Sequence, residues 1–232
     1  MMTERTLPGF VPVLFVLLTL GACASSTAGP GGGPVPIATL MEPESAEFSH
    51  PAPERFEVLF ETSQGEFVVE VHRDWAPLGA ERFYNLVRTG FYDGLRFFRV
   101  IPGFVAQFGI HAEPGVTDAW RSFRIPDDPV VQPNRQGTLT FATAGPGTRT
   151  VQLFLNLANN VHLDASGFAP IGEVISGMDA VERLYSGYGE GAPRGLGPDQ
   201  GRLQAEGEDY LSRDFPQLSR IVSARIISAA GL

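Results

Sequence analysis

The chain has 232 residues, a formal net charge of -9 at pH 7 and a sequence pI near 4.9. Binding to a nucleic-acid backbone requires a basic face, so this acidic composition excludes nucleic acid as a partner. The 17 Lys and Arg positions are all arginine, and a chain without lysine cannot use Schiff-base chemistry.

The first 22 residues are typical of a secretory signal peptide. An apolar run at residues 10–20 follows Arg5 and is interrupted by Pro12, whereas a membrane-spanning helix needs roughly 20 apolar residues. Residues 20–23 read Leu-Gly-Ala-Cys, which is similar to the lipobox of bacterial lipoproteins. Since Cys23 is the only cysteine, we expect lipid modification there. The alternatives are an uncleaved anchor and a cysteine without function.

Residues 23–54 predict a flexible tether, because this Gly-, Pro-, Ser- and Glu-rich stretch has too little apolar surface for a core. More than one acyl chain on Cys23 would anchor the protein stably to a membrane. We therefore expect a bacterial cell-envelope protein on the periplasmic face. Ala24 follows the cysteine, where an aspartate retains some Gram-negative lipoproteins at the inner membrane, and this favours the outer membrane.

Residues 55–232 have the length of one domain. Two alternating apolar runs, 56–62 and 66–72, predict a β-hairpin. Pro77, apolar residues at helical spacing and then Gly90 predict a helix. The other expected elements are strands at 95–101, 104–108, 138–142, 151–157, 171–175 and 221–227, and a second short helix at 178–185.

These elements predict a mainly β fold, in which eight antiparallel strands form a closed β-barrel capped by two α-helices. We expect a monomer. Residues 186–208 contain few apolar side chains and predict a long surface loop that continues into a helical turn at 210–215. The glycines at 187, 189 and 191 are weak support for phosphate binding, because neither a preceding strand nor a following Lys-Ser/Thr accompanies them.

Two stretches place a few polar side chains among apolar residues that alternate as in strands. Residues 97–107 read Phe-Phe-Arg-Val-Ile-Pro-Gly-Phe-Val-Ala-Gln, and residues 141–154 read Phe-Ala-Thr-Ala-Gly-Pro-Gly-Thr-Arg-Thr-Val-Gln-Leu-Phe. Together they predict an apolar groove framed by strands, with one fixed cation at Arg99.

Both stretches resemble the cyclophilin signatures Phe-His-Arg-x-Ile-Pro-x-Phe-x-x-Gln and Ala-x-Ala-Gly-Pro, the latter followed a few residues later by Gln-Phe-Phe. The resemblance extends over residues 56–227. Cyclophilins are peptidyl-prolyl cis-trans isomerases with eight antiparallel strands and two helices. The resemblance therefore implies this fold, isomerase activity on proline-containing polypeptides, and no cofactor.

By the same resemblance, Arg99 is the catalytic arginine, which donates toward the prolyl nitrogen and holds the proline carbonyl. An arginine suits this role because it is always charged and presents a rigid fork of donors. Phe104 and Gln107 complete the catalytic set. The resemblance implies substrate-binding roles for Val105, Ala142, Thr143, Ala144, Gln152, Phe154, His162, Leu163 and Phe168.

The implied roles differ among these residues. Phe104, Phe154 and Leu163 form the wall of the proline pocket, and Val105 replaces the usual methionine or leucine. Gln107 and Gln152 orient the arginine and contact the peptide. The stretch 142–144 offers an edge to the chain that precedes the proline, mainly through main-chain contacts like those of an added strand.

Some positions depart from the family pattern. Thr143 stands where asparagine is commoner, His162 where tryptophan is common, and Phe168 where histidine is usual. His162 in place of tryptophan at the rim of the groove predicts weaker binding of cyclosporin.

A metal site at His162 lacks partners, because the other histidines are scattered and no cysteine remains in the domain. The chain also lacks the Gly-x-Ser-x-Gly element of serine hydrolases.

The sequence favours a lipid-anchored prolyl isomerase that acts on exported proteins. One alternative is a non-catalytic barrel that binds proline segments as a chaperone or scaffold of the cell envelope. A barrel that carries a small-molecule cargo would need an open interior, whereas the inward positions here are Phe, Val, Leu and Ile.

Overall fold

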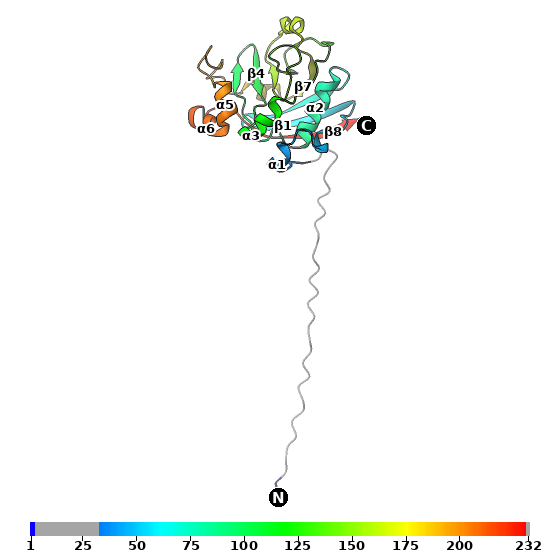
Figure 1. The fold of residues 1–232 in the computed structure, drawn as a ribbon, viewed down its shortest axis with the longest axis vertical. Helices are drawn as coiled ribbons and strands as arrows, with labels where there is room; N and C mark the ends of the chain where they lie inside the picture. The colour runs from blue at the N-terminus through cyan, green and yellow to red at the C-terminus, as the bar shows by residue number, and fades with distance from the viewer. Residues whose placement is uncertain (3–32, 231–232) are drawn as a thin grey trace.

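The structure is a computed structural model, and it describes residues 1, 2 and 33–230 (Figure 1). Most of the predicted signal peptide and the predicted lipidation site at Cys23 lie outside the described residues. Within the described part, none of the helices has the length and apolar character needed to span a bilayer.

Eight strands form one antiparallel sheet in the order β3-β4-β6-β5-β7-β2-β1-β8. All of the predicted strands are present, and the mainly β antiparallel fold is confirmed. The strands are β1 (Arg55–Thr62), β2 (Gly65–His72), β3 (Arg99–Ile101), β4 (Val105–Phe108), β5 (Thr138–Phe141), β6 (Leu153–Asn156), β7 (Pro170–Ser176) and β8 (Ile221–Ala230).

The sheet curls into a half-barrel, so the prediction of a closed barrel was overstated. Its edge strands, β3 and β8, share no strand ladder. Backbone hydrogen bonds join only the chain just before β3 to the start of β8: Phe97 N–H donates to the Ser219 carbonyl over 2.9 Å, and Ile221 N–H donates to the Leu95 carbonyl over 2.8 Å. β3 has three residues, too few to extend this pairing along the ten-residue β8.

The two-residue period of the strands divides their side chains between the core and the opposite face of the sheet. On β4, Ala106 and Phe108 belong to the main core, whereas Val105 and Gln107 lie on the other face. β6 follows the same rule, with Leu153 and Leu155 in the core. The second face of these strands is therefore free to build a groove.

Six α-helices are present in the described residues, more than the two predicted. The expected helices are α2 and a shorter α4, and α2 buries Phe83, Leu86 and Val87 against the sheet after Pro77 in its first turn. The helices are α1 (Ile37–Leu40), α2 (Pro77–Arg88), α3 (Pro114–Arg121), α4 (Met178–Glu182), α5 (Gln200–Glu206) and α6 (Glu208–Asp214).

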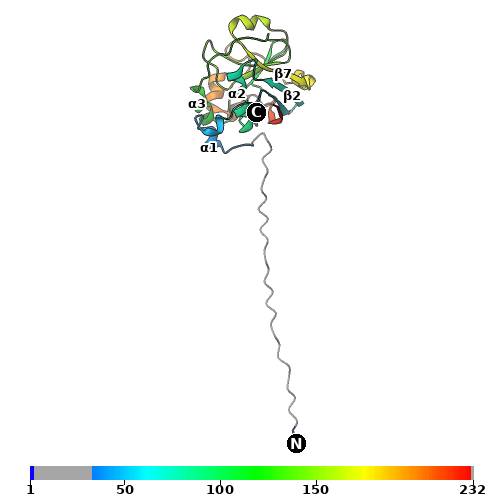
Figure 2. The same cartoon turned by 90° about the vertical axis from the view of Figure 1, so that its right-hand side faces the viewer.

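The prediction of a flexible tether up to residue 54 was wrong for residues 33–54, which pack on the domain. Figure 2 shows α1 next to α3, where Trp120 Nε1 donates to the Leu40 carbonyl over 2.7 Å. The backbone of His50 exchanges two hydrogen bonds with the Asn85 side chain on α2. The amino-acid composition of residues 33–54 did not predict this docking, because the segment attaches through backbone groups and few buried side chains, Leu40 and Ala52 among them.

Residues 186–218, between α4 and β8, form an insertion that packs on a small second core. Figure 1 shows α5 and α6 together at one flank of the sheet, beside α3. The segment predicted to be a long loop contains the helix α5. This helix was not predicted because Leu203 is its one buried residue, so the sequence shows no apolar residues at helical spacing. We call the core beneath these helices the satellite cluster, which consists of Phe98, Ile110, Leu203, Tyr210, Leu211 and Leu218.

Candidate active site

A groove of about 510 Å³ lies on the outer face of β4 and β6. Both predicted motifs reach it, because β3 and β4 carry the first and β5 and β6 frame the second. Of the residues predicted from sequence, those that line the groove are Arg99, Phe104, Val105, Gln107, Ala142, Thr143, Ala144, Gln152, Phe154, Leu163 and Phe168. The structure brings these residues together, and their individual roles stay predictions.

A chain of side-chain hydrogen bonds orients the guanidinium of Arg99. Arg99 lies directly opposite Gln107 in the β3–β4 pair, and its Nη1 donates to Gln107 Oε1 over 3.1 Å. Gln107 Nε2 in turn donates to Gln152 Oε1 over 3.0 Å. Because one amide fixes the next, these two bonds restrain the Arg99 guanidinium on the side that faces Gln107.

The apolar wall stands directly beside this cation. The guanidinium carbon of Arg99 lies 5.6 Å from the centre of the Phe104 ring. On the other side, the rings of Phe154 and Phe168 meet edge to face at 5.7 Å. The groove therefore places an apolar wall next to a fixed positive charge.

Residues 142–144 form one edge of the groove, and the side chain of Thr143 turns back into its own loop. Its hydroxyl lies 2.7 Å from Thr148 Oγ1 and accepts the Gly145 N–H over 3.1 Å. Ala144 N–H donates to the same Thr148 hydroxyl over 2.9 Å. Threonine at the position of the commoner asparagine thus stabilises the loop itself.

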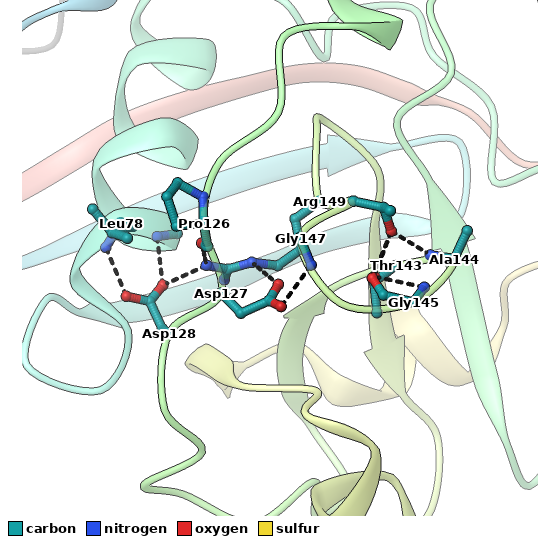
Figure 3. A network of polar contacts seen from close by, with 11 residues as sticks. Leu78, Pro126, Asp127, Asp128, Thr143, Ala144, Gly145, Gly147 and Arg149 are labelled. Atoms are coloured by element: carbon teal, nitrogen blue, oxygen red, sulfur yellow. Dashed lines mark hydrogen bonds and ion pairs between the residues drawn. The ribbon is translucent and has the colours of Figure 1, made fainter.

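A buried ion pair supports this edge from behind (Figure 3). Arg149 is 2% exposed, and its Nη2 donates to Asp128 Oδ2 over 3.0 Å and to the Pro126 carbonyl. Asp128 also accepts the backbone N–H groups of Leu78 and Gly79 at the start of α2, over 3.1 and 2.9 Å. The same carboxylate therefore stabilises a helix terminus and the strand connection that carries the groove edge.

His162 is the predicted site residue that does not line the groove. It is exposed, and its ring stacks on the outer side of Phe104 with centroids 6.2 Å apart. The structure thus places it on the rim. In the described part of the chain, no group of three or more His, Cys, Asp or Glu residues is arranged to hold a metal ion.

The insertion contributes a wall of the groove that was not predicted from the sequence. Glu190, Arg194 and Gln200 line the groove, together with Thr148 and Thr150 of the second motif region. Glu190 accepts two hydrogen bonds from Arg99, and these bonds hold the pKa of its carboxyl below the usual range. The only sequence signal for this wall was a few polar and charged residues in a stretch dense in glycine.

Comparison with known families identifies the chain. The family model described as cyclophilin type peptidyl-prolyl cis-trans isomerase/CLD matches residues 57–197, more than half of the sequence. The chain belongs to the cyclophilin family. The match spans both motifs, from β1 to the part of the insertion that carries Glu190.

Several peptidyl-prolyl cis-trans isomerases are similar to the chain over most of their own length. A peptidyl-prolyl cis-trans isomerase of Acinetobacter baylyi is 35% identical over 133 residues, which cover 55% of this chain and 70% of the relative. Peptidyl-prolyl cis-trans isomerase B of Escherichia coli is 33% identical over 141 residues, which cover 55% of this chain and 82% of the relative. The chain is therefore a prolyl isomerase by family.

A crystal structure of a cyclophilin type peptidyl-prolyl cis-trans isomerase from Cryptosporidium parvum has the same fold. It aligns with a TM-score of 0.55 at 20% identity, covering 75% of this cyclophilin and 98% of the other chain. A second crystal structure of that protein, in the presence of the dipeptide Ala-Pro, aligns with a TM-score of 0.54 at 20% identity and covers 74% of this chain and 99% of the other. These likenesses support the half-barrel architecture.

Proposed function

We propose that this cyclophilin isomerises X-Pro bonds of exported polypeptides by seating the proline ring on the apolar wall while Arg99 stabilises the twisted amide. The X-Pro bond exchanges between cis and trans over a barrier of about 18 to 20 kcal/mol, because rotation breaks amide resonance. No covalent step is needed. The barrier falls when the site binds the twisted amide more tightly than either planar form.

The observation that carries this proposal is the fixed position of Arg99 beside the proline wall. The hydrogen bonds through Gln107 and Gln152 hold the guanidinium, so little reorganisation is needed when the amide twists. The neighbouring Phe104 ring provides an apolar surface for the proline. Proline peptides as substrates are in keeping with the Ala-Pro dipeptide present with the Cryptosporidium parvum protein.

Exchange NMR on a short X-Pro peptide tests this function. The wild-type protein should accelerate cis–trans exchange, and folded Arg99→Ala should lose most of that acceleration. Binding of the peptide without any acceleration would favour the alternative, a proline-segment chaperone or scaffold. Circular dichroism of each variant would establish that the loss does not come from unfolding.

The cellular location is part of the proposal. We infer from the apolar run and the Leu-Gly-Ala-Cys sequence that Cys23 is lipid-modified and holds a monomeric domain at the periplasmic face of the cell envelope, with the outer membrane favoured. Cys23→Ala should release the protein from the membrane fraction or leave an unprocessed precursor. Unchanged membrane partitioning and processing of the variant would contradict this.

A further inference from the structure

The insertion brings a carboxylate to the proposed catalytic arginine. Glu190 Oε1 accepts from Arg99 Nε over 2.6 Å, and Glu190 Oε2 accepts from Arg99 Nη2 over 2.8 Å. Both side chains are mostly shielded from solvent, with exposed fractions of 33% and 18% for Glu190 and Arg99. A two-point contact of this kind fixes the plane of a guanidinium more firmly than a single bond does.

We propose that Glu190 is a positioning residue for Arg99, and that the insertion is therefore part of the isomerase machinery. This inference rests on the proposed role of Arg99. Neither cyclophilin signature contains a partner on this side of the arginine, and Gln107 supplies the contact on the other side.

The ion pair with Glu190 leaves part of the Arg99 guanidinium available to substrate. A guanidinium has five N–H groups. Glu190 takes the one on Nε and one on Nη2, and Gln107 takes one on Nη1. One N–H remains on each of the two terminal nitrogens. The carboxylate thus restrains the side chain while two donors stay free for the proline carbonyl and the prolyl nitrogen.

The loop around Glu190 is built to hold the carboxylate in one place. Gly191 N–H donates to Glu190 Oε1 over 2.9 Å, and Gly197 N–H donates to the Glu190 backbone carbonyl over 2.8 Å. A Cβ at Gly195 would collide with that same carbonyl oxygen. Gly191, one of the three glycines that suggested a weak phosphate motif, thus belongs to a tight turn that presents Glu190.

The satellite cluster ties both members of the pair to one packed unit. Phe98, the residue before Arg99, is 1% exposed and packs in this cluster, at the position where the family signature has histidine. Tyr188, two residues before Glu190, packs against the same cluster and meets the Phe215 ring at 5.0 Å. Because this base is shared, the geometry favours a fixed positioning contact over a mobile lid.

The groups around Glu190 lower the pKa of its carboxyl and keep it ionised. The hydrogen bond from Arg99 is the main cause that lowers the pKa of Glu190, and the Gly191 N–H and the charge of Arg194 lower it further. Burial acts in the opposite direction and is outweighed. At neutral pH, Glu190 is therefore a carboxylate that can hold the guanidinium.

Steady-state kinetics on the full mature chain test the proposal, using an X-Pro peptide and exchange NMR. Glu190→Ala should lower kcat about ten- to a hundredfold, the order expected when a catalytic group loses its alignment, with a much smaller change in KM. Glu190→Gln should lose less, because its amide oxygen can still accept one bond. Glu206→Gln is the matched control, since it removes a carboxylate from the insertion outside the groove, and its kcat should equal that of the wild type.

A double-mutant cycle separates positioning from a structural effect. If Glu190 acts through Arg99, Arg99→Ala combined with Glu190→Ala should be no slower than Arg99→Ala alone. Gly195→Ala, which displaces the backbone of the intact Glu190, should reproduce the loss and gives a second test if Glu190→Ala does not fold.

The outcomes distinguish this inference from the proposed function. Wild-type kcat in folded Glu190→Ala, or a further loss in the double variant, would overturn the positioning role alone. A rise in kcat would also overturn it, because Glu190 would then restrain the enzyme. Wild-type turnover in Arg99→Ala would instead refute the role of Arg99 on which both rest.

Discussion

The half-barrel and the insertion contribute to one groove, but they are stabilised in different ways. Phe60 in the half-barrel stacks on Phe67 at 4.8 Å and meets Phe108 edge to face at 6.0 Å, inside a core shared by most strands. The insertion has two seven-residue helices, α5 and α6, which are too short to be stable alone. The half-barrel is therefore specified by its own pattern, whereas the insertion depends on packing against Phe98 and Ile110.

The largest expected effect is on the half-barrel side. Asp128→Ala should lower the free energy of unfolding by about 3 to 5 kcal/mol, because it removes the buried carboxylate that pairs with Arg149 and uncaps α2. Urea unfolding measures this loss. Asp127→Ala is the matched control, since Asp127 is 35% exposed and lies 3.5 Å from Arg149, and it should cost much less. A wild-type midpoint for Asp128→Ala would contradict this account of the groove edge.

A second substitution tests whether the insertion unfolds separately. Leu203→Ala should cost about 2 to 4 kcal/mol within the satellite cluster, where the leucine is 1% exposed. Hydrogen exchange should show faster exchange in α5 and α6, with the amides of β1 and β2 unchanged. Leu196→Ala, at a residue 90% exposed, serves as the control. Equal acceleration in β1 and β2 would show that the two regions unfold as one unit.

The stability of the fold should be sensitive to pH through His111, which lies between β4 and α3 against the ring of Phe91. Burial lowers the pKa of His111 from 6.5 to about 4, so the unfolded chain takes up this proton more readily than the folded one. The contribution of neutral His111 to the free energy of unfolding is complete above the unfolded pKa and is lost as the pH falls toward 4. At pH 5 this loss is about 2 kcal/mol.

Urea unfolding at pH 7 and pH 5 measures this contribution. His111→Asn has an amide oxygen that can accept the Glu113 N–H in place of His111 Nδ1. The difference in unfolding free energy between the two pH values should be smaller in this variant by the same amount. The same pH dependence in wild type and variant would rule out His111 as its source.

The smallest effect concerns the rim. His162 is exposed beside Phe104, at a position where the resemblance to the family leads one to expect tryptophan, and we predict that this change weakens cyclosporin binding. His162→Trp should strengthen cyclosporin binding by about 0.5 to 1.5 kcal/mol, the value of one hydrogen bond. Titration calorimetry on the two proteins measures it. Nanomolar binding by the wild type would show that the rim change is unimportant.

The sequence predicted those parts of the site that depend on local pattern. Strand alternation and the two motifs located Arg99, Gln107 and Phe154, and the neighbouring strands β3, β4 and β6 bring these residues to one face. Glu190 could not be predicted, because its position depends on a segment that packs on the satellite cluster, whose member Phe98 lies far from it in sequence. Phe98 carried a signal only in retrospect, since a phenylalanine in place of a motif histidine requires an apolar partner.

The docked segment before β1 escaped prediction for a related reason. Residues 33–54 attach through backbone hydrogen bonds, such as that from Val35 N–H to the Thr89 carbonyl over 3.1 Å, and hydropathy does not report such bonds.

The ends of some strands also differed from prediction. β3 begins only at Arg99 because the preceding residues pair with the start of β8 instead.

The central claim is that Arg99 acts on the twisted amide and contributes little to ground-state binding. The most direct measurement compares kcat with the dissociation constant of an X-Pro peptide in folded Arg99→Ala, by exchange NMR at saturating and subsaturating peptide. We predict that kcat falls about a hundred- to a thousandfold, with a far smaller change in binding. Arg99→Lys should recover part of the rate, because a point charge cannot reproduce the planar fork. Equal losses in kcat and binding, or an unchanged kcat, would contradict the account.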